Sequence, residues 1–174
     1  LAAGCTIVLK PAEQTSLSAL YLGELIGEAG FPDGVVNIVT GDGQTTGSAL
    51  VSHPDVNKIS FTGSTEVGQI IGRAAMDNMA RVTLELGGKS PMIVLADCDP
   101  EKAAQGTAAA IFFNQGQTCS AGSRVYIHRS IFDTVVDRLA ELAEAIPLGS
   151  GLDPDAQMGP LVSQIQLDRV CSYI

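Results

Sequence analysis

The sequence predicts an α/β fold built on a doubly wound, mostly parallel sheet. Short β-branched stretches alternate with longer amphipathic stretches along the chain, which favours strands alternating with helices. Helices of this length between strands imply right-handed crossovers and parallel pairing of the strands. The chain has 174 residues, of which 45% are hydrophobic. That is enough for about one ordinary domain with a sizeable core.

Three strand-and-helix units are expected in the first half of the chain. The first helix begins at a cap formed by Thr15 or Ser16 and stops at Gly30 and Pro32. The second helix is short, and the third carries apolar residues at helical spacing. The predicted strands are residues 5–9, 35–39 and 58–61, and the predicted helices end near residues 29, 51 and 74.

The sequence pattern changes after Ala80, where two predicted strands flank a Gly-Gly-Lys-Ser-Pro turn at residues 87–91. A turn of this composition is rigid or acts as a hinge, so we expect a domain boundary there, between residues 1–86 and residues 87–174. The second part is also α/β. Its predicted strands are residues 81–86, 92–95 and 125–128, its predicted helices are residues 100–113 and 132–145, and residues 149–160 form a turn-rich loop.

The composition excludes several classes of protein. Ten Lys and Arg against 19 Asp and Glu give a net charge of −9, which disfavours binding to nucleic acid or to an anionic membrane. No apolar run approaches the roughly 18 residues that span a bilayer. The cysteines (Cys5, Cys98, Cys119 and Cys171) lack the C-x-x-C spacing of metal and redox sites. We therefore expect no metal, reduced thiols and a cytoplasmic location.

The predicted strand-to-helix turn at residues 61–68 is a candidate anion site. Gly63 would let a phosphate approach the backbone, and Ser64 can donate a hydrogen bond at the positive end of the following helix. Gly68 would permit close packing of that helix on its strand. The alternative is an ordinary turn with a serine cap. Structural glycines are likewise the better interpretation of Gly41 and Gly43, on their spacing alone.

Lys10 and Glu13 come just after the first predicted strand. Ligands bind at the carboxyl ends of parallel strands in open α/β sheets. A lysine there can donate to ribose hydroxyls, and a carboxylate can accept from an unmodified 2′-hydroxyl while it repels a 2′-phosphate. The alternative is a solvated pair of charges that contributes almost nothing.

Glu85 stands between apolar residues in a predicted strand and is followed by two glycines. A carboxylate in that setting is expected to be at least partly desolvated, which would suit a general base. The alternative is that strand alternation simply points Glu85 to solvent. The sequence pattern does not separate these two interpretations.

Cys119 ends a polar run that follows a predicted helix and contains Asn114, Gln117 and a compliant glycine. A thiol is partly ionised at neutral pH and is already nucleophilic. Cys98 is a poorer candidate because it lies between two aspartates, and Cys5 and Cys171 fit core positions. Nothing in the sequence pairs either histidine with Cys119, so a Cys-His hydrolase is unsupported.

Four stretches of the sequence together resemble the NAD(P)-dependent aldehyde dehydrogenase family. They occur in family order, and the resemblance extends over essentially all 174 residues. Two resemble the family's glutamate and cysteine signatures, one its cofactor turn and one its ribose-contacting loop. These stretches are VTLELGGKSP (residues 82–91), FFNQGQTC (112–119), FTGSTEVG (61–68) and KPAEQT (10–15). The resemblance is to the class that includes phenylacetaldehyde and betaine-aldehyde dehydrogenases.

The resemblance implies oxidation of an aldehyde to a carboxylic acid through a thiohemiacetal and a thioester on Cys119. Glu85 would activate the water that hydrolyses the thioester, whereas relatives that pass the acyl group to coenzyme A usually lack this glutamate. Residues 1–86 would belong to a Rossmann-like NAD-binding domain and residues 87–174 to the catalytic domain. NAD is expected in preference to NADP. The implied cofactor contacts are Lys10 and Glu13 at the ribose, Gly63 and Ser64 at the diphosphate, Gly43 at the adenine side, and Thr62, Val67, Leu86 and Gly87 along the cleft.

The family's oxyanion-hole asparagine, its downstream ribose-binding glutamate and its oligomerisation strand have no counterpart in this sequence. We therefore expect the 174 residues to be a segment of a longer polypeptide and to have little activity alone. The complete protein is expected to form a homodimer or homotetramer. Loss of one oxyanion donor typically lowers turnover by about 10²–10³-fold. A cofactor-independent thiol esterase and a non-catalytic nucleotide-binding module remain as alternatives.

Overall fold

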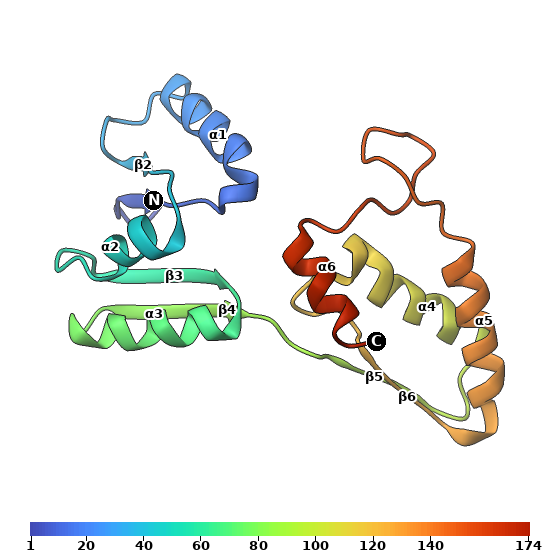
Figure 1. The fold of residues 1–174 in the computed structure, drawn as a ribbon. Helices are drawn as coiled ribbons and strands as arrows, with labels where there is room; N and C mark the ends of the chain where they lie inside the picture. The colour runs from blue at the N-terminus through green and yellow to red at the C-terminus, as the bar shows by residue number, and fades with distance from the viewer. The chain divides into compact units, whose positions relative to one another are not determined.

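The computed structural model describes residues 1–174 and divides into two compact units, Leu1–Leu84 and Glu85–Ile174. Strands alternate with helices in both units, as the labels of Figure 1 show in chain order. The α/β class is therefore confirmed. The strands hydrogen-bond in three separate pairs (β1–β2, β3–β4 and β5–β6), so the chain does not form one continuous sheet.

The first unit opens with a parallel pair of short strands, β1 (Ile7–Leu9) and β2 (Val36–Ile38), in which Ile7 lies opposite Val36. Between them come a 3₁₀ turn, η1 (Glu13–Thr15), and the helix α1 (Ser16–Glu28). Thr15 occupies the cap position, but its side chain makes no capping hydrogen bond, so the predicted cap is wrong. The predicted stop is confirmed, because Gly30 adopts a left-handed φ of 81° after the helix.

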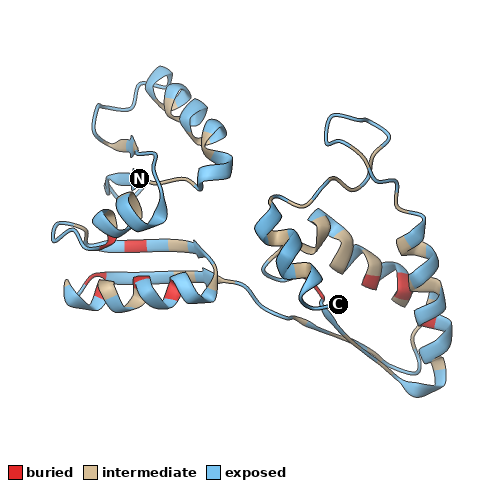
Figure 2. Cartoon of the chain, viewed as in Figure 1, coloured by how far each residue is buried: buried red, intermediate tan, exposed pale blue.

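The rest of the first unit holds its core. A single π-helical turn, η2 (Gly43–Gly47), leads into α2 (Ser48–Val51). The strand β3 (Lys58–Gly63), the helix α3 (Thr65–Asp77) and the strand β4 (Arg81–Leu86) follow. β3 pairs with β4. One face of α3 packs on this pair, and the buried side chains of the cluster are Val51, Ile59, Ile71, Ala75 and Ala80. Figure 2 shows this burial concentrated on β3 and α3.

The second unit pairs β5 (Pro91–Val94) with β6 (Arg124–Ile127) in parallel. α4 (Pro100–Phe112) is capped by Asp99 and ends in the turn η3 (Phe113–Gly116). α5 (Phe132–Glu144) follows the short η4 (Arg129–Ile131), and α6 (Gln164–Cys171) closes the chain. α4 packs on α5, where Ala104 and Val135 are completely buried and Thr107 nearly so.

Residues 149–160 form turns, as predicted. The base of this loop is closed by an isolated parallel bridge between Leu148 and Met158 and by a 3.0 Å hydrogen bond from the Gly149 N–H to the Met158 carbonyl. Across the whole structure, none of the helices has the length and apolar character needed to cross a bilayer.

Candidate functional site

Lys10 and Glu13, which the sequence places at a candidate ribose site, lie together at the carboxyl end of β1. The Lys10 Nζ donates to Glu13 Oε1 at 3.3 Å, to the Gly41 carbonyl at 2.9 Å and to the Pro11 carbonyl at 2.9 Å. All three ammonium protons therefore already have acceptors. The Lys10 side chain is 15% exposed, whereas that of Glu13 is 49% exposed. Glu13 is thus the member of the pair that is open to a ligand.

The negative charge of Glu13 is stabilised locally. Its own backbone N–H, then the Lys10 ammonium, and to a smaller degree the Gly43 N–H hold the pKa of this carboxyl below its ordinary value. The contribution from Gly43 brings a third predicted cofactor residue to the same place. Gly41, two residues before Gly43, shapes the backbone here. Its φ of 143° is disfavoured for other residues, and the absence of a Cβ leaves room for the Thr46 side chain.

The turn between β3 and α3 forms the predicted serine cap. Ser64 Oγ accepts a hydrogen bond from the Val67 N–H at 3.3 Å, which leaves the hydroxyl proton available to donate elsewhere. A Cβ on Gly63 would overlap the Phe61 ring, so a larger residue at this position would require that ring to move. Thr62 and Val67 are exposed, and Gly68 is buried against the core, as its role in packing predicts.

The structure decides between the two interpretations of Glu85, a desolvated carboxylate or one that strand alternation points to solvent. Its side chain is exposed, while Leu84 and Leu86 on either side are half-buried. The expected desolvation of this carboxylate is therefore wrong for this chain, because strand alternation turns the two leucines inward and Glu85 to solvent. Gly87, the next predicted cofactor residue, is also exposed, with open space where a Cβ would stand.

Cys119 lies in a turn after a left-handed stretch of backbone. The φ values of Asn114, Gln115 and Gly116 are 51°, 57° and 72°. Asparagine and glycine tolerate this conformation, but glutamine adopts it rarely, and such conformations concentrate at functional sites. Cys119 itself is exposed.

Several contacts hold the turn that carries Cys119. The Ala121 N–H donates to the Thr118 carbonyl at 3.0 Å, and the Gly122 N–H donates to the Ala110 carbonyl of α4 at 3.1 Å. From the other side, Gly88 approaches so closely that a Cβ there would lie 3.3 Å from the Cys119 carbonyl oxygen. Gly88, the second glycine after Glu85, thus approaches the backbone of the candidate nucleophile.

The remaining cysteines and histidines do not form a second thiol site. Cys98 is half-buried, whereas Cys5 and Cys171 are exposed, so their predicted place in the core is wrong. Cys5 precedes a strand whose residues are all exposed, and Cys171 ends a helix without buried residues. Each histidine accepts a local backbone hydrogen bond in its own turn, from Asp55 and Ser130 respectively.

Two polar contacts of the structure were not predicted from the sequence. Asp42 caps the π-helical turn by accepting from the Thr45 N–H at 2.7 Å, and the pKa of its carboxyl is lowered chiefly by that bond. An aspartate three residues before the bonded N–H is a recognisable cap signal. Gln117 accepts a hydrogen bond from the Val162 N–H at 3.2 Å. No local signal predicts that bond, since the two residues are 45 positions apart.

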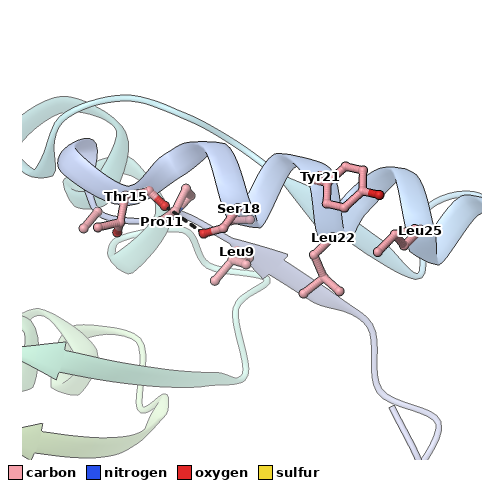
Figure 3. Close-up of a pocket in the computed structure, with 9 residues that line it drawn as sticks. Leu9, Pro11, Thr15, Ser18, Tyr21, Leu22 and Leu25 are labelled. Atoms are coloured by element: carbon pink, nitrogen blue, oxygen red, sulfur yellow. Dashed lines mark hydrogen bonds between the residues drawn. The ribbon is translucent and has the colours of Figure 1, made fainter. Parts of the chain in front are cut away.

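The structure also shows an open apolar groove beside α1. Leu22 and Leu25 of the helix and Leu9 of β1 line it, and Figure 3 shows them together with the hydrogen bond from Ser18 to the Thr15 carbonyl. Tyr21 on the same helix is 61% exposed. The groove adjoins Lys10 through Pro11, but none of the residues predicted to contact the cofactor lines it.

Comparison with known proteins identifies the family. A model described as the aldehyde dehydrogenase family matches residues 1–174. A phenylacetaldehyde dehydrogenase of Pseudomonas fluorescens is 59% identical over the whole chain, which covers 35% of that relative. Human retinaldehyde dehydrogenase 3 is 53% identical over the whole chain, which covers 34% of it. The chain thus spans about a third of the length of these relatives.

Solved structures agree. An NAD⁺ complex of an aldehyde dehydrogenase from Bacillus cereus matches 99% of this chain, and 35% of its own, with 54% identity and a TM-score of 0.96. A betaine aldehyde dehydrogenase of Staphylococcus aureus in complex with NAD⁺ matches 99% of this chain, and 34% of its own, with 40% identity and a TM-score of 0.96. Because the family model matches all 174 residues, this chain belongs to the aldehyde dehydrogenase family.

Proposed function

We propose that this chain carries the nucleophile and part of the cofactor surface of an NAD-dependent aldehyde dehydrogenase that releases a free carboxylic acid. The observation that carries the proposal is Cys119, an exposed thiol on a left-handed, multiply anchored turn in a chain whose full length matches the family. Residues 1–86 would form part of the NAD-binding domain and residues 87–174 part of the catalytic domain.

The residues of the first unit fit an NAD molecule. The half-exposed carboxylate of Glu13 would accept from a ribose hydroxyl, and its negative charge would repel a 2′-phosphate, so NAD is preferred over NADP. Lys10 would donate to the same ribose if it exchanged its contact with Glu13, the longest of its three. Gly43 would border the adenine. Two of the matching structures, from Bacillus cereus and Staphylococcus aureus, are NAD⁺ complexes.

The turn before α3 fits the diphosphate. Ser64 keeps a hydroxyl proton to donate, the amino end of a 13-residue helix favours negative charge, and Gly63 would lie against the diphosphate. Thr62, Val67, Leu86 and Gly87 would line the remainder of the cofactor surface. When bound, NAD supplies the two-electron oxidant of the reaction.

In the proposed mechanism, the Cys119 thiolate forms a bond to the aldehyde carbon, and the carbonyl oxygen becomes an oxyanion. The Cys119 N–H donates to that oxyanion. After oxidation, Cys119 holds the acyl group as a thioester. Glu85 takes a proton from water as its oxygen attacks the thioester carbon, the C–S bond breaks, and the acid leaves. The exposed carboxylate of Glu85 is accessible to water, although the desolvation expected of a general base is absent.

A graft tests this proposal. The matching third of the Pseudomonas fluorescens relative is replaced by this segment, and NADH production from phenylacetaldehyde is followed by stopped flow. Cys119→Ser is expected to abolish the reaction. Glu85→Gln is expected to retain a burst of about one NADH per site, followed by slow turnover, because the thioester forms but is not hydrolysed. Unchanged steady-state turnover in Glu85→Gln would contradict the role of Glu85.

Labelling of the 174-residue chain separates the other possibilities. Selective, pH-dependent alkylation of Cys119 by iodoacetamide, altered by NAD, is expected for the dehydrogenase. Ester hydrolysis without any cofactor requirement would favour a thiol esterase, and uniform inertness of the thiols would favour a nucleotide-binding module. We also propose a reduced, cytoplasmic setting, because a chain of this size can build a core without disulfides.

The chain alone is expected to turn over little aldehyde, because it spans about a third of its relatives and lacks the oxyanion-hole asparagine that the family resemblance implies. We propose that it acts within a longer polypeptide that assembles as a homodimer or homotetramer. Robust NAD-linked oxidation by the 174 residues would overturn the first expectation. The mass of the complete protein in solution would decide the second.

A further inference from the structure

We propose that Gln117 is a positioning residue for Cys119, because its side chain ties the nucleophile turn to the segment Gly159–Val162. This inference rests on the proposed function, since it assigns Gln117 a part in the reaction at Cys119. The geometry that carries it is a set of side-chain amide bonds, which we call the amide tether. Gln115 and Gln117 form one side of the tether, and the backbone N–H groups of Gly159 and Val162 form the other.

The first part of the tether closes the left-handed turn on itself. The Gln117 N–H donates to the Asn114 carbonyl at 2.9 Å, and the Gln117 side-chain amide donates to the same oxygen at 3.4 Å. In return, the Asn114 side-chain amide donates to the Gln117 carbonyl at 3.2 Å. These reciprocal bonds join the two ends of residues 114–117, and so hold Gln115, four positions before Cys119, in a left-handed conformation that glutamine rarely adopts.

The second part reaches across to the other segment. Gln117 Oε1 accepts from the Val162 N–H at 3.2 Å. The Gln115 amide, oriented with its oxygen toward Gly159, accepts from the Gly159 N–H at 3.1 Å, and its nitrogen then donates to the Asn114 carbonyl at 2.9 Å. In the opposite orientation the Gln115 oxygen instead accepts from the Gln117 side-chain nitrogen at 3.0 Å, so the bond from the Val162 N–H to Gln117 is the link that does not depend on how the Gln115 amide is oriented.

The receiving segment is itself held at both ends. Upstream, the Gln157 and Met158 N–H groups both donate to the Pro147 carbonyl, at 2.9 and 3.1 Å. Downstream, Ser163 caps α6 by accepting from the Gln166 N–H at 3.2 Å. The tether therefore joins the nucleophile turn to a loop base and a helix start, which makes it a fixed anchor for Cys119.

Gln117 is expected to affect the reaction through its place in the turn before Cys119. Gln117 does not lie on the reacting atoms; it acts by holding the turn from which the Cys119 sulfur attacks. A displacement of about 1 Å in a reacting group can cost about 10²-fold in rate. Loss of the tether should therefore lower the rate of the chemical step while leaving the cofactor residues, which lie elsewhere in the chain, unaffected.

Gln117→Met tests this in the grafted enzyme described above, because methionine keeps the side chain's length and removes both amide bonds. We expect kcat to fall at least about tenfold and the KM for NAD to change by less than about twofold. Gln117→Glu keeps an acceptor for the Val162 N–H and should recover most of kcat. The matched control is Gln105→Met on α4, which also loses one exposed side-chain hydrogen bond, to Glu101 at 2.6 Å.

Amide hydrogen exchange at Val162 gives a readout that does not depend on catalysis. In the 174-residue chain, exchange at this N–H should accelerate in Gln117→Met and stay slow in Gln117→Glu. Equal kcat in Gln117→Met and Gln105→Met, or Gln117→Glu as impaired as Gln117→Met, would overturn the proposal. If the unsubstituted graft does not oxidise aldehyde, the proposed function fails, and exchange at Val162 still decides whether the tether exists.

Discussion

The contact between Gly88 and Cys119 predicts that a single methyl group at position 88 disturbs the proposed nucleophile. An alanine Cβ there would lie 3.3 Å from the Cys119 carbonyl oxygen. That oxygen belongs to the backbone, so the methyl group can be accommodated only if the turn shifts by a few tenths of an ångström. The φ of Gly88 is not among the left-handed values, so alanine introduces no backbone strain of its own.

The size of the effect follows from that shift. If about 1 Å of misplacement costs about 10²-fold, a shift of roughly 0.3 Å corresponds to a loss of roughly fourfold in kcat for Gly88→Ala. Gly88→Val adds two further methyl groups at the same contact and should cost at least about tenfold. The change in the free energy of unfolding combines two opposed effects: the tight contact strains the turn, whereas replacing glycine at a compatible φ typically stabilises by about 0.4–1 kcal/mol through the unfolded chain.

The assay is steady-state NADH production by the grafted enzyme, with urea unfolding of each variant alongside. Gly106→Ala on α4 is the matched control, since nothing lies within 4 Å of a Cβ at that position. Unchanged kcat in both Gly88 variants would refute the reasoning, because it would mean that the turn carrying Cys119 moves freely away from position 88.

Three further outcomes are expected. Val135→Ala removes two carbons from a completely buried side chain and should lower the free energy of unfolding by about 2 kcal/mol, measured by urea denaturation. Ser64→Ala removes the cap of α3 and should cost about 1 kcal/mol by the same measurement. The Arg138 guanidinium, bonded to Glu101 at 2.7 Å, holds the pKa of that carboxyl below its ordinary 4.5. The stability it contributes is therefore present above pH 4.5 and lost as the pH falls through the lowered value, so Glu101→Gln should lose stability less steeply between about pH 5 and about pH 2.

Much of the fold could be predicted because its signals are local. The stop of α1 at Gly30, the proline and aspartate that begin α4 and the apolar faces of α3 and α5 are all recognisable within a few residues. Thr15 shows where local signals fail, because a residue of the right type at the cap position does not make the capping bond. The separation of the strands into three pairs is a tertiary property that no window of sequence contains.

The contacts of the candidate site are likewise predictable where they are local in the sequence and unpredictable where they are not. Short-range partners such as Lys10 and Glu13, or Ser64 and the Val67 N–H, are predictable from spacing, since the members of each pair are three positions apart. The exposure of Glu85 was one of two equal alternatives, and only packing on one side of β4 decided it. The bond between Gln117 and Val162 could not be predicted, because its two ends approach only once the loop after α5 has folded back.

The distribution of burial bears on how these sites work. The chain exposes 12326 Å², whereas two separate globular domains of half its mass would expose roughly 9,700 Å² together. The excess is partly apolar: all three residues of β1 are exposed, and no residue before Val51 is buried. Lys10 and Glu13 therefore lie on the part of the chain with the least core. Their geometry depends on a few hydrogen bonds, so anything that covers β1 and α1 would also stabilise the proposed ribose site.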